Sequence, residues 1–138
     1  MEVSVCALRA VVELRDRQRT ESARALASER RQRDVQAQAL AAAEQQRLDV
    51  PTSASSADLL DMYERATRAA DILVNRAREA LVHCDRAVDL HLDAHRLRCL
   101  QHQSLVRIVD RRAEDARHVE RRQERRTADD MVRRPTSS

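Results

Sequence analysis

The chain has 138 residues, of which 36% are charged and 42% hydrophobic, and its formal net charge is +3. It contains no Gly, Trp or Phe, and Tyr63 is its single aromatic residue. β-Sheets and tight turns depend on aromatic or β-branched residues and on glycine-containing turns, and compact cores depend on large aromatic side chains. The composition therefore argues against both, and it fits a single all-α unit of the long-helix or coiled-coil type.

Charge is distributed unevenly along the chain, and every basic residue is an arginine. Residues 1–48 carry 9 Arg and 7 acidic residues, residues 49–110 carry 8 and 10, and residues 111–138 carry 9 and 6. Both ends are therefore mildly basic and the middle is mildly acidic.

One segment, residues 49–56, interrupts the helical pattern. Pro51 has no amide hydrogen and drives Val50 out of the α region, so the helix that precedes it must end near residue 48. Ser55 and Ser56 are good N-caps for the next helix. The sequence predicts an antiparallel two-helix coiled-coil hairpin that forms one domain over residues 1–138. Its expected parts are a first helix over about 4–48, a loop over 49–56, a longer second helix over about 57–131 and a disordered tail over 132–138.

The apolar residues of the first helix form two clusters, separated by polar stretches. These clusters contain Val5, Leu8, Val11, Val12 and Leu14, and then Ala23, Leu26, Ala37, Leu40 and Leu48. A coiled coil optimised for stability carries Leu or Ile throughout such positions. We therefore expect a flexible hairpin of marginal stability.

The second helix carries two apolar stripes. One stripe has alternating spacings of four and three residues and includes Leu59, Tyr63, Ala66, Ala70, Leu73, Val88, Leu92, His95, Cys99, His102, Val106 and Val109. The other lies on nearly the opposite side and contains Leu90, Ala94, Leu97, Leu105 and Ile108. A helix that is apolar all round is expected to make contacts on more than one face.

If the turn is centred near residue 52, the numbers of facing residues add up to about 105. Leu8 then lies opposite Leu97, and the first helix runs out opposite residue 104. Four apolar residues would have no cover inside the hairpin: Leu105, Val106, Ile108 and Val109. We expect these four residues to bind a partner or a second copy, because large exposed apolar patches usually mark interfaces.

Two clusters carry residue types that occur in functional sites. The first cluster contains His91, His95, Cys99 and His102, whose spacings are ones that zinc ligands on a helix use. However, His95, Cys99 and His102 belong to the first apolar stripe, where polar residues set the register or the choice of partner. The second is a row of like charges, Asp85, Asp89 and Asp93, which Arg86 and Arg96 relieve in part. We favour a structural role for the first cluster and a solvated face for the second, and expect neither a metal nor a cofactor.

Catalysis, nucleic-acid binding and insertion into a membrane are not expected. A two-helix hairpin has no concavity that excludes water, so the chain is predicted not to be an enzyme. The arginines between 111 and 126 alternate with acidic residues and have no aromatic residue beside them for base stacking, which argues against nucleic-acid binding. No secretory signal or membrane-spanning stretch is visible, and the three cysteines have no paired spacing, so reduced thiols are expected.

In its Gly-poor composition and its pattern of Ala, Leu, Arg and Glu residues, the chain resembles the FliJ/YscO-type stalk proteins of flagellar and virulence type III secretion systems. The resemblance rests on three segments: Ala7-Leu8-Arg9 to Leu14-Arg15, Ala23-Arg24-Ala25-Leu26-Ala27, and the charged end from Arg122 to Arg134. It implies a monomeric cytoplasmic stalk at the secretion apparatus that binds the hexameric secretion ATPase, the export-gate membrane protein and secretion chaperones. By the same resemblance, the candidate ATPase contacts are Leu8, Val12, Arg15, Arg19, Arg121, Arg122, Arg125, Arg126, Asp129 and Asp130.

Two other functions remain open from the residues alone. A self-associating structural coiled coil would use residues 88–109 as its oligomer core. A peripheral membrane or nucleic-acid binder would rely on the arginines.

Overall fold

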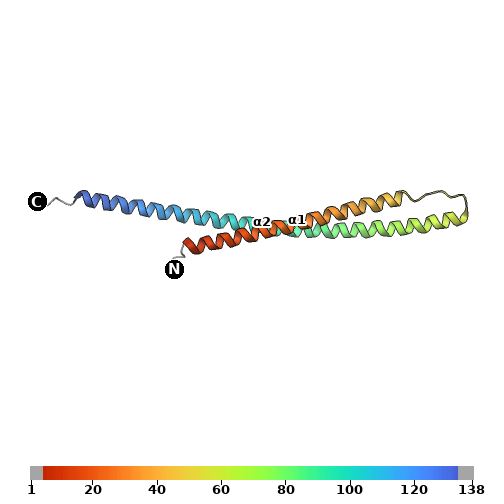
Figure 1. The fold of residues 1–138 in the computed structure, drawn as a ribbon, viewed down its shortest axis with the longest axis horizontal. Coiled ribbons are helices and arrows are strands. Elements are labelled where there is room, and N and C mark those ends of the chain that lie inside the picture. The colour runs from red at the N-terminus through yellow and green to blue at the C-terminus, as the bar shows by residue number, and fades with distance from the viewer. Residues whose placement is uncertain (1–4, 134–138) are drawn as a thin grey trace. The chain divides into compact units, whose positions relative to one another are not determined.

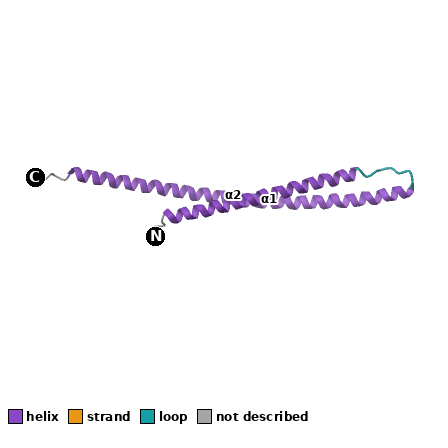
Figure 2. Cartoon of the chain, in the orientation of Figure 1, coloured by secondary structure: helices purple, strands orange, loops and turns teal. Residues whose placement is uncertain are grey.

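The computed structural model describes residues 5–133, and within this range its regular elements are two helices. α1 spans Val5–Leu48 and α2 spans Ala57–Arg133, with the connecting loop drawn in teal in Figure 2. The helices run antiparallel and α2 is the longer one, which confirms the predicted fold (Figure 1). α2 extends two residues past its predicted end, and the rest of the predicted disordered tail lies outside the described residues.

Contacts divide the hairpin into two units. The loop unit consists of Thr20–Arg96, in which the later turns of α1 pack against the first half of α2. The terminal unit contains the described residues up to Arg19 and from Leu97 onward, in which the first turns of α1 pack against the second half of α2.

Local hydrogen bonds explain where the helices end. The Asp49 amide donates to the Gln45 carbonyl oxygen at 3.0 Å, and Pro51, two residues later, ends the regular hydrogen-bond pattern. The Leu59 amide donates to the Ser56 side-chain oxygen at 3.3 Å, so Ser56 caps the N-terminus of α2 as predicted.

The register of the two helices differs from the prediction. Arg47 pairs with Asp71, and Arg33 with Asp85, so that the numbers of the paired residues add up to 118 rather than about 105. The contact between Asp16 and His102 in the terminal unit has the same sum of 118. The prediction that Leu8 lies opposite Leu97 is therefore wrong.

The path of the loop explains the shift. Val50 and Pro51 lie against the first turns of α2 and line a groove with Met62, Tyr63 and Ala66, so the loop is not a tight turn (Figure 1). Eight extended residues reach up to about 26 Å. That is enough to follow the first thirteen residues of α2, which span about 20 Å. As a result, α1 ends beside the turn that begins at Ala70 and not beside the start of α2.

The shifted register also covers residues that were expected to be bare. Val106 and Val109 line a groove together with Arg9, Val12 and Glu13 of α1, and Leu105 is half-buried. The premise that these residues have no cover inside the hairpin is thus wrong, because α1 reaches further along α2 than a tight turn would allow. Ile108 remains exposed, and the partner-binding role of the four residues stays a prediction.

The described residues contain only a small core. Leu26, Ala70 and Val74 are buried, with exposed fractions of 5%, 7% and 3%, and all three belong to the loop unit. Among the described residues of the terminal unit, none is buried. The seam between the helices therefore excludes little apolar surface from water, in line with the sparse apolar pattern of α1.

Val74 is the most buried of the three residues, so truncation of its side chain should lower the stability of the fold. We expect Val74→Ala to lower the free energy of unfolding by about 1–2 kcal/mol, because it removes two buried carbon atoms next to an open groove. Urea unfolding followed by circular dichroism measures this. The matched control is Val35→Ala, whose side chain is 59% exposed. It should change stability by no more than about 0.5 kcal/mol, and an equal effect of both variants would contradict the assigned packing.

Candidate interaction surfaces

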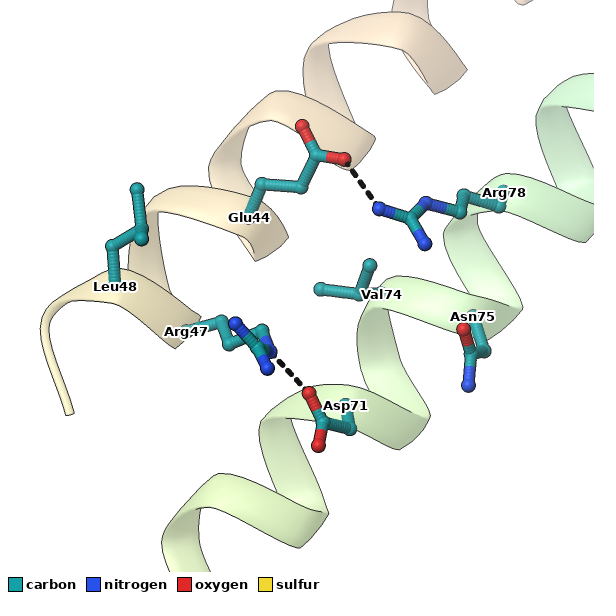
Figure 3. A pocket seen from close by; sticks show the side chains of 7 residues that line it. All are labelled: Glu44, Arg47, Leu48, Asp71, Val74, Asn75 and Arg78. Atoms are coloured by element: carbon teal, nitrogen blue, oxygen red, sulfur yellow. Dashed lines mark hydrogen bonds and ion pairs between the residues drawn. The ribbon is translucent and has the colours of Figure 1, made fainter. Parts of the chain in front are cut away.

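Two ion pairs enclose Val74 in the loop unit. Figure 3 shows the Glu44 carboxylate accepting from the Arg78 guanidinium at 3.1 Å on one side, and Arg47 donating to Asp71 on the other. The acid comes from α1 in one pair and from α2 in the other, so the two pairs together specify one alignment of the helices. Asn75 and Leu48 complete a groove of about 570 Å³ at this point. Because it is shallow, polar and held by its own ion pairs, this groove is a structural feature rather than a reaction site.

A third ion pair joins the helices further along the loop unit. Arg33 Nε donates to an Asp85 carboxylate oxygen at 2.6 Å. This hydrogen bond, followed by the negative charge of Asp85, raises the pKa of the Arg33 guanidinium above its ordinary value. Arg33 of α1 therefore offsets the repulsion between Asp85 and the other carboxylates of its row, whereas the sequence had assigned this role to Arg86. Asp93 lies 3.7 Å from Arg96, which confirms the other part of that prediction.

The histidines of the candidate metal cluster face α1. In the loop unit, His95 Nδ1 and the Ser22 hydroxyl are hydrogen-bonded at 2.8 Å, and His91 Nε2 lies 3.7 Å from Glu29. In the terminal unit, His102 Nε2 lies 3.7 Å from Asp16. Over residues 5–133, no group of three or more His, Cys, Asp or Glu side chains is arranged to hold a metal ion. The structure thus places these histidines in the seam, as the favoured interpretation held.

The N-terminal candidate residues for ATPase binding are engaged within the terminal unit. Arg15 donates to Gln101 of α2 and to Gln18, both at 3.1 Å, and Arg19 lies 2.7 Å from Asp16. Leu8 and Val12 are half-buried. Arg15 and Val12 thus lie against α2, and Arg19 pairs within α1, so the four side chains form a smaller part of the outer surface than the sequence suggested.

The C-terminal candidate residues lie on an uncovered helix. Ala113 is the last half-buried residue of α2, and residues 114–133, which we call the C-terminal extension, are all exposed. The extension contains the six remaining candidates: Arg121, Arg122, Arg125, Arg126, Asp129 and Asp130. The described part of the chain shows no ion pair for any of them. All six are therefore displayed for contact with another molecule.

The cross-helix ion pairs were not found by sequence reasoning. Each of them depends on which residues of α1 and α2 face one another, and the predicted register was shifted by about thirteen residues. Oppositely charged residues that flank a seam are a known signal of register in coiled coils. A search for the alignment that pairs the most opposite charges was the available way to find them.

Two other expectations concern the cysteines and the membrane. Within the described residues, Cys6, Cys84 and Cys99 form no disulfide. Neither α1 nor α2, over the residues described, has a stretch that is long and apolar enough to cross a bilayer.

The pair of Glu44 and Arg78 is about half exposed, so its contribution should be small but measurable. A double-mutant cycle with Glu44→Ala and Arg78→Ala should give a coupling free energy of about 0.2–1 kcal/mol in urea unfolding. High salt should weaken this coupling, because ions screen exposed charges. Zero coupling at low salt would mean that the two residues do not face one another in solution.

No protein-family model matches the chain, and neither a curated protein nor a solved structure is significantly similar to it. What is established is therefore the fold itself, a coiled-coil-like hairpin of two antiparallel helices in which α2 is the longer.

Proposed function

We propose that the chain is a non-enzymatic stalk or adaptor protein of a bacterial type III secretion apparatus, where it binds the hexameric secretion ATPase and links it to the export gate and to secretion chaperones. The observation that carries the proposal is the C-terminal extension, residues 114–133, in which every residue is exposed. The resemblance of the charged end from Arg122 to Arg134 to stalk proteins of these systems supports the same role.

The chemistry of the extension suits a protein surface that carries carboxylates. An arginine guanidinium presents several N–H donors in a planar fork and binds carboxylates in pairs of hydrogen bonds. Arg121, Arg122, Arg125 and Arg126 supply four such groups within two turns of helix, and none of them has an ion-pair partner among the described residues. The extension also contains six acidic residues, so it is net neutral, and its arginines act by local pairing that orients the complex.

The weak seam suits a protein that works inside a moving assembly. Its ion pairs are about half exposed, and a typical exposed pair contributes only about 0–1 kcal/mol. Segments with few buried apolar contacts open and deform at low cost in free energy. Under the proposal, the hairpin tolerates distortion while the ATPase turns over, and the loop unit offers its surface to the export gate or to chaperones.

The alternative function is that of a self-associating structural coiled coil. Large apolar side chains on the outside of α2, including Leu90, Leu97 and Leu100, favour it. The alternative makes no use of an ATPase, so binding to the purified ATPase distinguishes it from the stalk function.

The direct test is the affinity of the full chain for the purified hexameric type III secretion ATPase of the same bacterium, measured by isothermal titration calorimetry. We expect Arg125→Glu/Arg126→Glu to weaken binding at least about tenfold, because two favourable charge contacts become repulsive. High salt should weaken binding of the unsubstituted chain.

The matched control is Arg65→Glu/Arg68→Glu in the loop unit. These two arginines pair with Asp61 and Glu64 of their own helix, so the control changes net charge by the same amount on a different surface. It should bind like the unsubstituted chain. An equal loss in both variants, or no binding of the unsubstituted chain, would count against the proposal.

A further inference from the structure

The part of α2 between residues 73 and 94 carries a second apolar face, beside the face that packs on α1. Leu90 is 72% exposed and Leu73 is 50% exposed, whereas their neighbours Val74, Val88 and His91 are buried or half-buried against α1. The face repeats at spacings of three and four residues, as seam residues of coiled coils do. We call it the outer face, and it contains Leu73, Arg76, Ala80, His83, Ala87, Leu90 and Ala94, of which Ala80 and Ala87 are half-buried at its border with α1.

We infer that the outer face is a self-association surface, on which α2 of a second copy packs antiparallel and centred on His83. The inference goes beyond the proposed function, because it replaces the monomer that the resemblance implies with a monomer–dimer equilibrium. All residues of the outer face belong to the loop unit, while the candidate ATPase contacts belong to the terminal unit.

Residue sizes fit this arrangement. With His83 on the two-fold axis, Leu73 faces Ala94 of the second copy, and Ala80 faces Ala87. A large side chain thus meets a small one at the ends, and two small residues meet on either side of the centre, which lets the helices approach closely. Arg76 faces Leu90 of the second copy, and the aliphatic part of its side chain is suited to cover that leucine.

Charges select the antiparallel orientation. Glu79 and Arg86 are exposed beside the outer face, and neither forms an ion pair within the described chain. In the antiparallel arrangement, Glu79 of each copy faces Arg86 of the other, and the two-fold axis produces this pair twice. A parallel arrangement in register would place Glu79 and Arg86 of one copy on the opposite side of the interface from the same residues of the other copy, so this pair would not form. The outer face is therefore complementary to itself, which identifies a second copy as its occupant.

The first experiment measures self-association of the full chain by sedimentation velocity over a series of concentrations. We expect a monomer–dimer equilibrium, and Leu90→Asp should raise its dissociation constant about 100-fold, since a two-fold interface contains each substitution twice. The matched control, Val119→Asp, changes an exposed residue of the C-terminal extension and should leave the constant unchanged. A monomer at every concentration, or a dimer that Leu90→Asp does not weaken, would overturn the inference.

The second experiment tests orientation and register. Glu79→Arg alone and Arg86→Glu alone should each weaken the dimer, and the double substitution should restore it, because both charges are then exchanged. With Cys6, Cys84 and Cys99 replaced by Ser, His83→Cys should form an intermolecular disulfide under oxidation, and Leu90→Cys should not, because Leu90 faces Arg76. Equal cross-linking at both positions, or failure of the double exchange to restore the dimer, would refute the antiparallel arrangement.

Discussion

The two ion pairs on either side of Val74 determine which turn of α1 lies beside which turn of α2, and the other features follow from that alignment. The loop must run along the first turns of α2 to allow it, and His95 and His102 then meet Ser22 and Asp16. The same alignment ends the cover by α1 near Ala113 and leaves the C-terminal extension exposed. A shift of the helices by one turn would break these contacts together.

The seam specifies an alignment more than it stabilises the fold. Apolar burial is confined to a few side chains, while charged and polar pairs recur along both units. Half-exposed ion pairs add little free energy, but wrong pairings of charge are unfavourable, so such a seam discriminates between registers. A correctly aligned hairpin displays the C-terminal extension and the outer face on separate units.

Composition and local signals predicted the helices well. The absence of Gly, the single break at Pro51 and the cap at Ser56 placed the helix ends within two residues of those observed. Register was not predictable in this way, because it depends on which charged residues pair across the helices and on a loop path that allows this pairing. The wrong register predicted that Val106 and Val109 have no cover, whereas they line a groove with residues of α1. It also gave no sign that Arg15 pairs with Gln101 of α2. The exposure of the arginines after residue 120 follows from the length of α2 alone, and their binding role stays a prediction.

The alignment is tested most directly by site-specific disulfide formation in a chain whose native cysteines are replaced by Ser. The pair Ser22→Cys/His95→Cys should form an intramolecular disulfide readily under mild oxidation, since the two side chains are in contact. The pair Leu8→Cys/Leu97→Cys, which a tight turn at residue 52 would bring together, should stay reduced. Efficient cross-linking of the second pair and none of the first would contradict the register on which the account depends.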